Sequence, residues 1–157
     1  MSTSSDATEK LGELLGKLLS TPEVIELRSD LGGGKTTFVR GLARGFGSSD
    51  TMTSPTFTLN KIYKNKAGKE IHHFDFYRLS EPGVLEDQLK EALDNNGIIT
   101  VIEWSDIVKD VLPKDHLSIE FNPVATDPDE RQIIFYYHEP HIGLIKKLQS
   151  QWVEVEP

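Results

Sequence analysis

The chain has 157 residues, a formal net charge of -8 and no cysteine. Without cysteine, disulfides and thiolate metal sites are excluded, and the acidic balance disfavours direct binding of DNA or tRNA, which needs a basic face. No apolar stretch approaches the ~20 residues of a membrane span, and no N-terminal segment combines positive charge with an apolar run. We expect one cytoplasmic domain over residues 1–157.

The first half of the chain predicts a helix, a buried strand, a second helix and a β-hairpin. These patterns occupy, in order, residues 5–19, 24–28, 36–46, and the pair 56–63 and 70–77. Leucines fall on one face of the first helix, and Asp6 is its expected N-cap. Gly47 is expected to end the second helix, and the polar residues 64–69 are expected to form the hairpin turn.

The second half predicts a helix, a strand, a short helix, two more strands and a closing helix. The corresponding segments are residues 80–97, 98–102, 105–112, 117–121, 131–137 and 141–152. Ser80 is the expected N-cap of the first of these helices, and Asn96-Gly97 is its expected end. Pro113 is expected to end the short helix, and the turn-rich residues 122–130 to separate the last two strands.

A glycine-rich loop, SDLGGGKTT over residues 29–37, lies between the first predicted strand and the second predicted helix. It fits the phosphate-binding pattern G-x-x-x-x-G-K-[ST], except that Ser29 stands at its first glycine. If the backbone there needs a positive φ, serine adds about 1–2 kcal/mol of strain, too little to abolish binding. A plain helix-capping turn explains the glycines but neither the Lys-Thr pair nor the preceding strand, so nucleotide binding is favoured.

The residue types of this loop suit a triphosphate. Glycines let backbone N–H groups converge on phosphate oxygens, and the start of a helix favours an anion. Lys35 would reach the β- and γ-phosphates, and the Thr36 hydroxyl would bind Mg²⁺. The loop residues expected to contact ATP are Leu31, Gly32, Gly33, Gly34, Lys35, Thr36 and Thr37. We therefore expect an α/β, P-loop NTPase-like fold: a three-layer αβα domain with a mixed central sheet.

Two acidic residues are candidates for the chemistry. Glu103 follows the apolar strand 98–102, where a P-loop site needs an acid for the metal or water, and we favour that role over a solvent-facing strand end. Asp75 alternates with Phe74 and Phe76, so it is either an exposed strand residue or a functional acid. The adjacent histidines at 72–73 point to opposite faces of a strand, which disfavours a shared metal ion.

The segment TSPTFT, residues 53–58, lies between the P-loop helix and the next predicted strand. Nucleotide switches place a hydroxyl in such a loop to sense the γ-phosphate or its metal. Thr53, Ser54 and Thr56 would supply that hydroxyl. A plain turn around Pro55 explains the same residues about equally well.

Four motifs, SDLGGGKTT, TSPTFTL, HHFDFYRL and VIEWSD, occur in an order and spacing that resemble the TsaE (YjeE) family. These proteins are small bacterial P-loop ATPases of the threonylcarbamoyladenosine tRNA-modification system. The resemblance runs from about Thr8 to about Arg131. Each motif alone is weak, but the four together are specific.

The resemblance implies roles that spacing alone does not. Lys35 and Thr36 match the phosphate and Mg²⁺ positions, Glu103 a second Mg²⁺-associated acid, and Asp75 a functionally important aspartate. Thr8 matches a position that helps to bind ATP, Arg131 is similar to one on the nucleotide side, and Trp104 matches the tryptophan after the acid. The family has glycine where Ser29 stands and usually alanine where Gly33 stands.

The family's partners are TsaD and TsaB, which install the carbamoyl group on the adenosine next to the anticodon. The resemblance therefore implies an ATPase that supports turnover of that complex, with tRNA reached only indirectly and no membrane involved. The expected catalytic residues are Lys35, Asp75 and Glu103. Arg40, Arg44 and Arg78 are unplaced candidates for an arginine finger, so we expect weak ATP hydrolysis without partners.

Three alternatives remain open at this stage. A small-molecule kinase would use the same phosphate cradle but needs an acceptor pocket and a catalytic base. A non-catalytic nucleotide-binding module would fit a phosphate-binding loop that has lost its catalytic function, as the serine at position 29 could indicate. A GTP switch reads guanine through N-K-x-D, and the segment NKIY at 60–63 lacks the acid because Tyr63 stands in its place.

Overall fold

The computed structural model describes residues 1–49, 60–77 and 79–153, which contain six strands of one sheet. The elements are, in chain order, α1 (Ser5–Leu18), β1 (Glu23–Arg28), α2 (Lys35–Phe46), β2 (Asn60–Lys64), β3 (Glu70–Asp75), α3 (Gly83–Leu93), β4 (Ile98–Glu103), η1 (Ser105–Val108), β5 (Leu117–Val124), β6 (Asp127–Tyr136), η2 (Glu139–His141) and α4 (Ile142–Val153). No helix in these described ranges is long and apolar enough to cross a bilayer.

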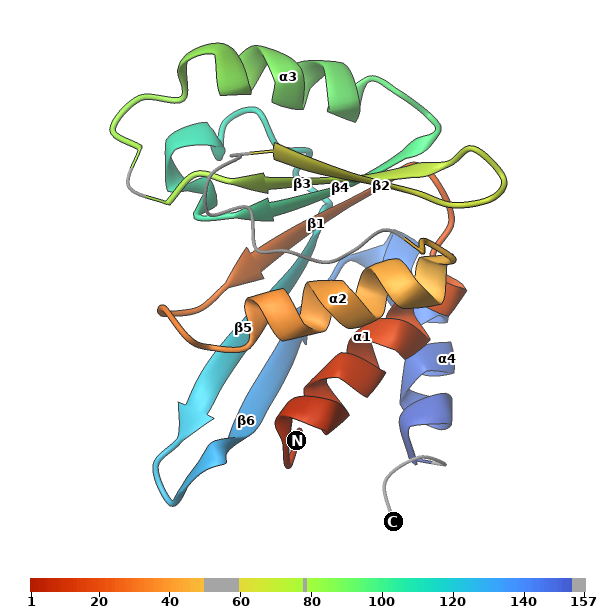
Figure 1. The fold of residues 1–157 in the computed structure, drawn as a ribbon, viewed down its shortest axis with the longest axis vertical. Helices are drawn as coiled ribbons and strands as arrows, with labels where there is room; N and C mark the ends of the chain where they lie inside the picture. Colours follow the sequence, from red (N-terminus) through yellow and green to blue (C-terminus); the bar gives the residue numbers. More distant parts are fainter. Residues whose placement is uncertain (50–59, 78, 154–157) are drawn as a thin grey trace.

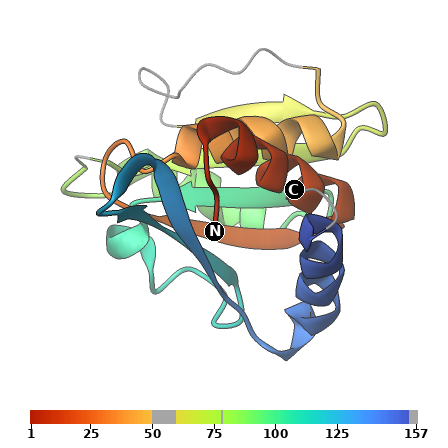
Figure 2. The ribbon, with the colours of Figure 1, turned by 90° about the horizontal axis from the view of Figure 1, so that it is seen from below.

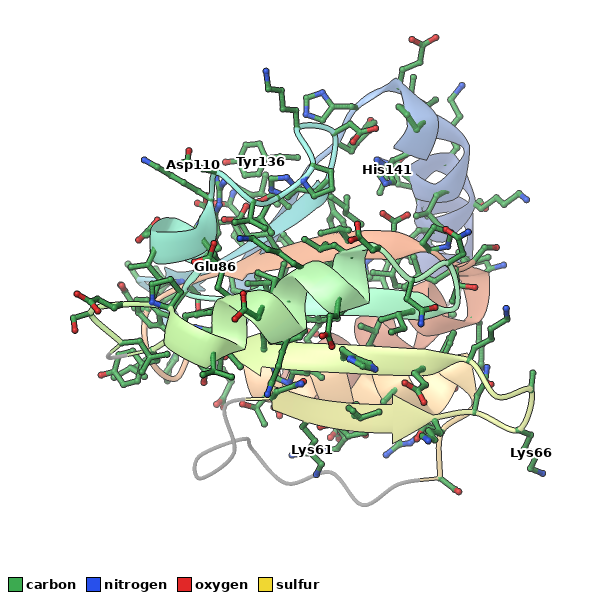
Figure 3. All side chains as sticks on the ribbon, turned by 90° about the horizontal axis from the view of Figure 1, so that it is seen from above. Lys61, Lys66, Glu86, Asp110, Tyr136 and His141 are labelled. Carbon is green, nitrogen blue, oxygen red and sulfur yellow. The ribbon has the colours of Figure 1, made fainter. Side chains whose placement is uncertain are left out.

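The sheet is mixed, and its strand order is β2-β3-β4-β1-β5-β6. The four central strands run parallel, whereas β2 and β6 pair antiparallel at the two edges. Helices α1 and α2 cover one face with α4 beside α1, and α3 covers the other face (Figure 1 and Figure 2). Figure 3 looks onto that second face, where α3, which carries Glu86, lies in front of the strands. This arrangement confirms the predicted three-layer αβα fold.

Two apolar clusters fill the space between these layers. The larger cluster packs α1, α2 and α4 against the sheet around Leu15, Phe38 and Ile119, and the smaller packs α3 and η1 around Phe74 and Leu89. Strand β4 is buried along its whole length, as expected for a central parallel strand covered on both faces. Its end is therefore fixed in position by packing from both sides.

The helix ends differ from the predicted caps in two places. Ser4, not Asp6, is the N-cap of α1, because the Ser4 hydroxyl accepts a hydrogen bond from the Ala7 N–H at 3.0 Å. Helix α3 begins at Gly83 after Pro82, and the prediction of Ser80 as its cap is wrong. The residue before a proline, here Glu81, disfavours helical backbone, so Ser80 does not cap the helix. Gly47 ends α2 in a left-handed conformation, as predicted.

Three segment boundaries also differ. Strands β5 and β6 extend through the expected turn at residues 122–130 and pair as far as Val124 with Asp127. Pro123 is tolerated because β5 pairs with β1 only as far as Glu120, so its missing N–H is not needed there. The short helix predicted over 105–112 is a single 3₁₀ turn, and α3 ends at Leu93 rather than at Asn96-Gly97.

Helices α1 and α2 touch through glycines, which lets their backbones approach closely. A methyl group built at Gly12 or Gly16 would lie 2.2 Å from a carbonyl oxygen of α2. One built at Gly41 or Gly45 would lie 1.9 Å or 2.0 Å from a carbonyl oxygen of α1. These distances are far below contact, so α1 lies against α2 only because all four residues lack a side chain. The contact brings the start of α1 beside the loop that precedes α2.

A buried carboxylate ties β1 to its neighbours. The Glu26 carboxylate accepts hydrogen bonds from Ser118 Oγ at 2.7 Å and from Ser105 Oγ, and it pairs with His116 Nε2 at 2.9 Å and with the Arg28 guanidinium at 2.8 Å. Burial alone would raise the pKa of Glu26, but these donors together hold it well below its usual range. The hydrogen bond to Glu26 raises the pKa of His116.

We expect Gly41→Ala to lower the free energy of unfolding by about 1–3 kcal/mol, because the new methyl must push α1 away from α2. The matched control is Gly143→Ala in α4, where a methyl meets nothing within 4 Å and alanine favours the helix by up to about 1 kcal/mol. Urea unfolding of both variants measures the difference. Equal effects in the two variants would contradict the close helix contact.

The His116–Glu26 pair predicts a pH dependence of stability. Because the folded pKa of His116 lies above its unfolded value, near 6.5, the pair stabilises the protein fully below that pH. The contribution is lost as the pH rises through the folded pKa. We expect the difference in unfolding free energy between wild type and His116→Gln to shrink over the pH range that starts near 6.5 and extends upward. Urea unfolding across that range tests this, and a constant difference would refute it.

Candidate functional site

The glycine-rich loop opens onto a cavity of about 270 Å³ at the carboxyl ends of the parallel strands. This is where ligands bind in open α/β sheets. The cavity is lined by Leu31, Gly32, Gly33, Gly34, Lys35, Thr36, Thr37, Asp75, Tyr77, Glu103 and Trp104. The loop, which connects β1 to α2 (Figure 1), therefore meets both predicted acids and the predicted tryptophan in one place.

The backbone of the loop has the shape that its glycines allow. Gly32 and Gly34 are left-handed, with φ of 77° and 98°, a conformation that strains other residues. Gly34 is the N-cap of α2, so the free N–H groups of the first turn point toward the cavity side of the helix start. Ser29 does not have a positive φ, and the backbone strain considered for serine at this position therefore does not arise.

The Lys35 ammonium is buried and held by its own loop. The residue is only 7% exposed, and Nζ donates to Ser29 Oγ at 2.7 Å, to Ser29 O at 3.0 Å and to Asp30 O at 3.2 Å. It also lies 5.0 Å from the ring centroid of Trp104. Burial lowers the pKa of Lys35, whereas the negative charges of Glu103, Asp75 and Asp30 oppose that shift.

The two acids occupy neighbouring strand ends. Asp75 on β3 is directly paired with Glu103 on β4, and the Tyr77 N–H donates to the Asp75 carboxylate at 2.9 Å. Glu103 is 5% exposed, so it does not face solvent. Burial raises the pKa of Asp75, and the nearby charge of Glu103 raises it further. Two carboxylates and one ammonium thus share a partly desolvated cavity.

Several buried polar atoms on β3 and β4 have no hydrogen-bond partner among the described residues. They are Glu103 Oε1, both ring nitrogens of His73 and the Thr100 hydroxyl. His73 Nε2 lies 3.4 Å from Glu103 Oε1, and His73 is 1% exposed. Because buried polar atoms are normally paired, the Glu103 carboxylate, which lines the cavity and whose Oε1 has only this long contact with His73, is a group that a bound cation or its waters would stabilise.

The oxygen donors present fit Mg²⁺. Thr36 and Glu103 line one cavity, and Mg²⁺ typically takes only one or two protein oxygens together with phosphates and water. The described ranges hold no cluster of three or more His, Asp or Glu side chains that could enclose a metal ion. His72 does not form a metal site with His73, because the His72 ring hydrogen-bonds to Glu70 at 2.7 Å.

Thr8 lies beside the loop, and neither Thr8 nor Arg131 lines the cavity. A methyl at Gly34 would sit 3.7 Å from the Thr8 methyl, but the Thr8 hydroxyl is turned inward to Ser2 Oγ at 2.7 Å and to Ser4 O at 3.2 Å. Ser2 in turn forms a backbone bridge to Arg131. In this structure Thr8 packs against Gly34, Arg131 is connected to Thr8 only through Ser2, and the predicted contact of both residues with ATP stays a prediction.

The remaining candidates divide into two groups. Thr53, Ser54 and Thr56 of the expected switch-like loop, and Arg78, lie outside the described residues. Arg40 and Arg44 both pair with Glu9 on α1, at 3.1 Å and 2.5 Å, and neither lines the cavity. Tyr77 was not among the predicted site residues. Tyr77 lies in the turn after β3, where its N–H donates to Asp75, and the expected strand alternation, which put it on the same face as Asp75, could have identified it.

Comparison with known proteins gives a consistent family. The family model described as "Threonylcarbamoyl adenosine biosynthesis protein TsaE" matches residues 2–133. A Haemophilus influenzae protein named "tRNA threonylcarbamoyladenosine biosynthesis protein TsaE" is 42% identical over 107 residues, which are 68% of this chain and 67% of that protein. A Rickettsia felis protein of the same name is 36% identical over 147 residues, or 92% of this chain and 83% of that protein.

The fold agrees with this assignment. The crystal structure of YdiB from Bacillus subtilis superposes with a TM-score of 0.74 and 28% sequence identity, covering 94% of this chain and 90% of that one. A Bacillus subtilis protein named "tRNA threonylcarbamoyladenosine biosynthesis protein TsaE" is also 34% identical over 83% of this chain and 79% of that protein. Sequence, architecture and the P-loop cavity together show that the chain belongs to the TsaE family of threonylcarbamoyladenosine biosynthesis proteins.

Proposed function

We propose that the protein binds and hydrolyses ATP, and that this cycle supports a TsaB–TsaD complex that modifies tRNA next to the anticodon. The observation that carries the proposal is the single cavity in which the glycine loop and Lys35 face Asp75 and Glu103. Loop amides and an ammonium suit phosphate oxygens, and the carboxylates suit water or a metal. A plain helix-capping turn would need neither the buried lysine nor the buried Glu103.

The residues take distinct parts in the proposed reaction. Amides of the loop and Lys35 bind the β- and γ-phosphates and stabilise the charge that develops as water attacks in line. Glu103, buried at the end of β4, orients the attacking water. Asp75, fixed by the Tyr77 N–H, supports that arrangement from the neighbouring strand. Mg²⁺, held by Thr36 and Glu103, would neutralise charge on the phosphates.

Slow hydrolysis by the isolated chain follows from its arginines. Arg40 and Arg44 are both engaged by Glu9, so among the described residues no arginine is placed to contact the γ-phosphate. P-loop sites without such an arginine are slower by about 10³–10⁵. A partner that completes the site would supply the missing stabilisation, which fits a subunit whose turnover depends on its complex.

The acidic surface agrees with an indirect role in tRNA modification. A net charge of -8 does not favour contact with a polyanion, so the TsaB–TsaD complex rather than this chain would hold the tRNA. The proposal locates this activity, together with its partners, in the cytoplasm. The proposal therefore separates ATP hydrolysis, carried by this chain, from group transfer, carried by its partners.

Lys35→Ala should weaken ATP·Mg²⁺ binding by about 10–100-fold, because a charge-assisted hydrogen bond to phosphate is lost. Calorimetric titration of wild type and variant measures the change. Lys146→Ala removes an exposed lysine on α4 that does not line the cavity, and it should bind ATP like wild type. Identical titrations for Lys35→Ala and wild type would remove the nucleotide proposal.

Adding purified TsaB and TsaD should raise the rate of phosphate release from ATP, because no arginine among the described residues lines the site. Phosphate release is followed with and without the partners, with Glu103→Gln as the variant that should stay slow in both conditions. Free phosphate as the product separates hydrolysis from a kinase reaction, in which the label would move to a metabolite. Equal turnover with and without the partners would count against the proposed role.

A further inference from the structure

The Lys35 ammonium has no free donor in this structure. An ammonium carries three N–H bonds, and three acceptors lie within hydrogen-bond distance of Nζ: Ser29 Oγ, Ser29 O and Asp30 O. The Ser29 hydroxyl is the nearest of the three, at 2.7 Å. Because all three N–H bonds are engaged, Lys35 has to give up or share at least one of these contacts to bind a β- or γ-phosphate. The loop thus competes with phosphate for its own lysine.

The Ser29 hydroxyl is fixed as an acceptor for that lysine. Its own proton is donated to Asp30 O at 2.7 Å, which leaves the oxygen lone pairs directed to Nζ. The two backbone carbonyls that also hold Lys35 would be present with any residue at position 29. The hydroxyl is the one contact that depends on serine.

Gly33 provides the space that the Ser29 side chain occupies. A methyl group at Gly33 would lie 2.2 Å from Ser29 Oγ and 2.7 Å from Ser29 Cβ. Gly33 does not have a positive φ, so the backbone itself would accept another residue. A side chain at position 33 would therefore clash with the hydroxyl and the Cβ of Ser29.

We propose that Ser29 is a positioning residue that holds Lys35 in a retracted position and thereby lowers the affinity of the site for ATP. This inference rests on the proposed nucleotide binding. Phosphate must displace the hydroxyl from Nζ before Lys35 can bind it, so the hydroxyl acts on the unbound state and weakens binding. We expect this loss of affinity only for ligands that contact Lys35, which are those with a β-phosphate.

The opposite role for Ser29 makes a contrary prediction. If the hydroxyl moved with Lys35 and bound phosphate itself, its removal would weaken ATP binding rather than strengthen it. Ser29→Ala separates the two roles, because it removes the hydroxyl and keeps Cβ. Ser150→Ala is the matched control, since it removes a hydroxyl on α4 that bonds only its own helix at Lys147 O.

The first measurement needs no nucleotide. In protein labelled with ¹⁵N at lysine Nζ, the ammonium protons of Lys35 should exchange with water slowly in wild type and in Ser150→Ala. They should exchange several-fold faster in Ser29→Ala, because one of the three acceptors is lost. Gly33→Ala, which displaces the Ser29 hydroxyl, should also speed exchange, but it should have no such effect in a Ser29→Gly background. Unchanged exchange in Ser29→Ala would overturn the proposal.

The second measurement is nucleotide affinity by calorimetry. Ser29→Ala should lower the Kd for ATP·Mg²⁺ on the order of tenfold, the usual weight of one hydrogen bond to a charged group, and leave the Kd for AMP unchanged. An unchanged or higher Kd for ATP, or an equal change for AMP, would overturn the proposal. If no variant binds any nucleotide, the proposed function fails, and ammonium exchange alone decides whether Ser29 holds Lys35.

Discussion

The buried charge of Lys35 constrains most of the candidate site. A buried ammonium is costly unless charges and hydrogen bonds compensate it, and here the compensation comes from several elements. Ser29 and Asp30 supply oxygen acceptors from the loop, while Asp75 and Glu103 supply negative charge from the ends of β3 and β4. The loop, the helix start and the strand ends therefore have to keep one relative arrangement, and that arrangement is a phosphate-sized cavity between opposite charges.

Two contacts outside the cavity maintain that arrangement. The glycines between α1 and α2 let the helices meet backbone to backbone, which places Thr8 against Gly34 at the start of α2. On the opposite face, the Glu26 carboxylate joins β1 to β5 and to Ser105, two residues beyond Glu103. The strand that leads into the loop and the strand end that carries Glu103 are therefore connected through one buried group.

Much of the fold and part of the site could be predicted from the sequence. Apolar runs located β1 and β4, helical periodicity located α1, α2 and α4, and the Lys-Thr pair after glycines located the loop. The burial of Glu103 agrees with its position after an apolar strand. Periodicity does not report three features of the structure: the Ser4 cap, the extension of β5 past Pro123, and the inward turn of the Thr8 hydroxyl. They depend on contacts with residues that are distant in the sequence, or on a choice between neighbouring residues that could each form the contact. In the sequence, glycines such as Gly41 are expected to weaken a helix, and their role is clear only once the contact with the partner helix is known. The contact between the Ser29 side chain and Gly33 is likewise seen only in the three-dimensional structure.

The account depends most on where the Lys35 ammonium lies when a triphosphate is present. A crystal structure with Mg²⁺ and a non-hydrolysable ATP analogue measures this directly. We expect Nζ to leave Ser29 and lie within hydrogen-bond distance of β- and γ-phosphate oxygens, with Glu103 facing the phosphate end of the cavity. A nucleotide bound elsewhere, with Lys35 still held by Ser29 and Asp30, would contradict the account.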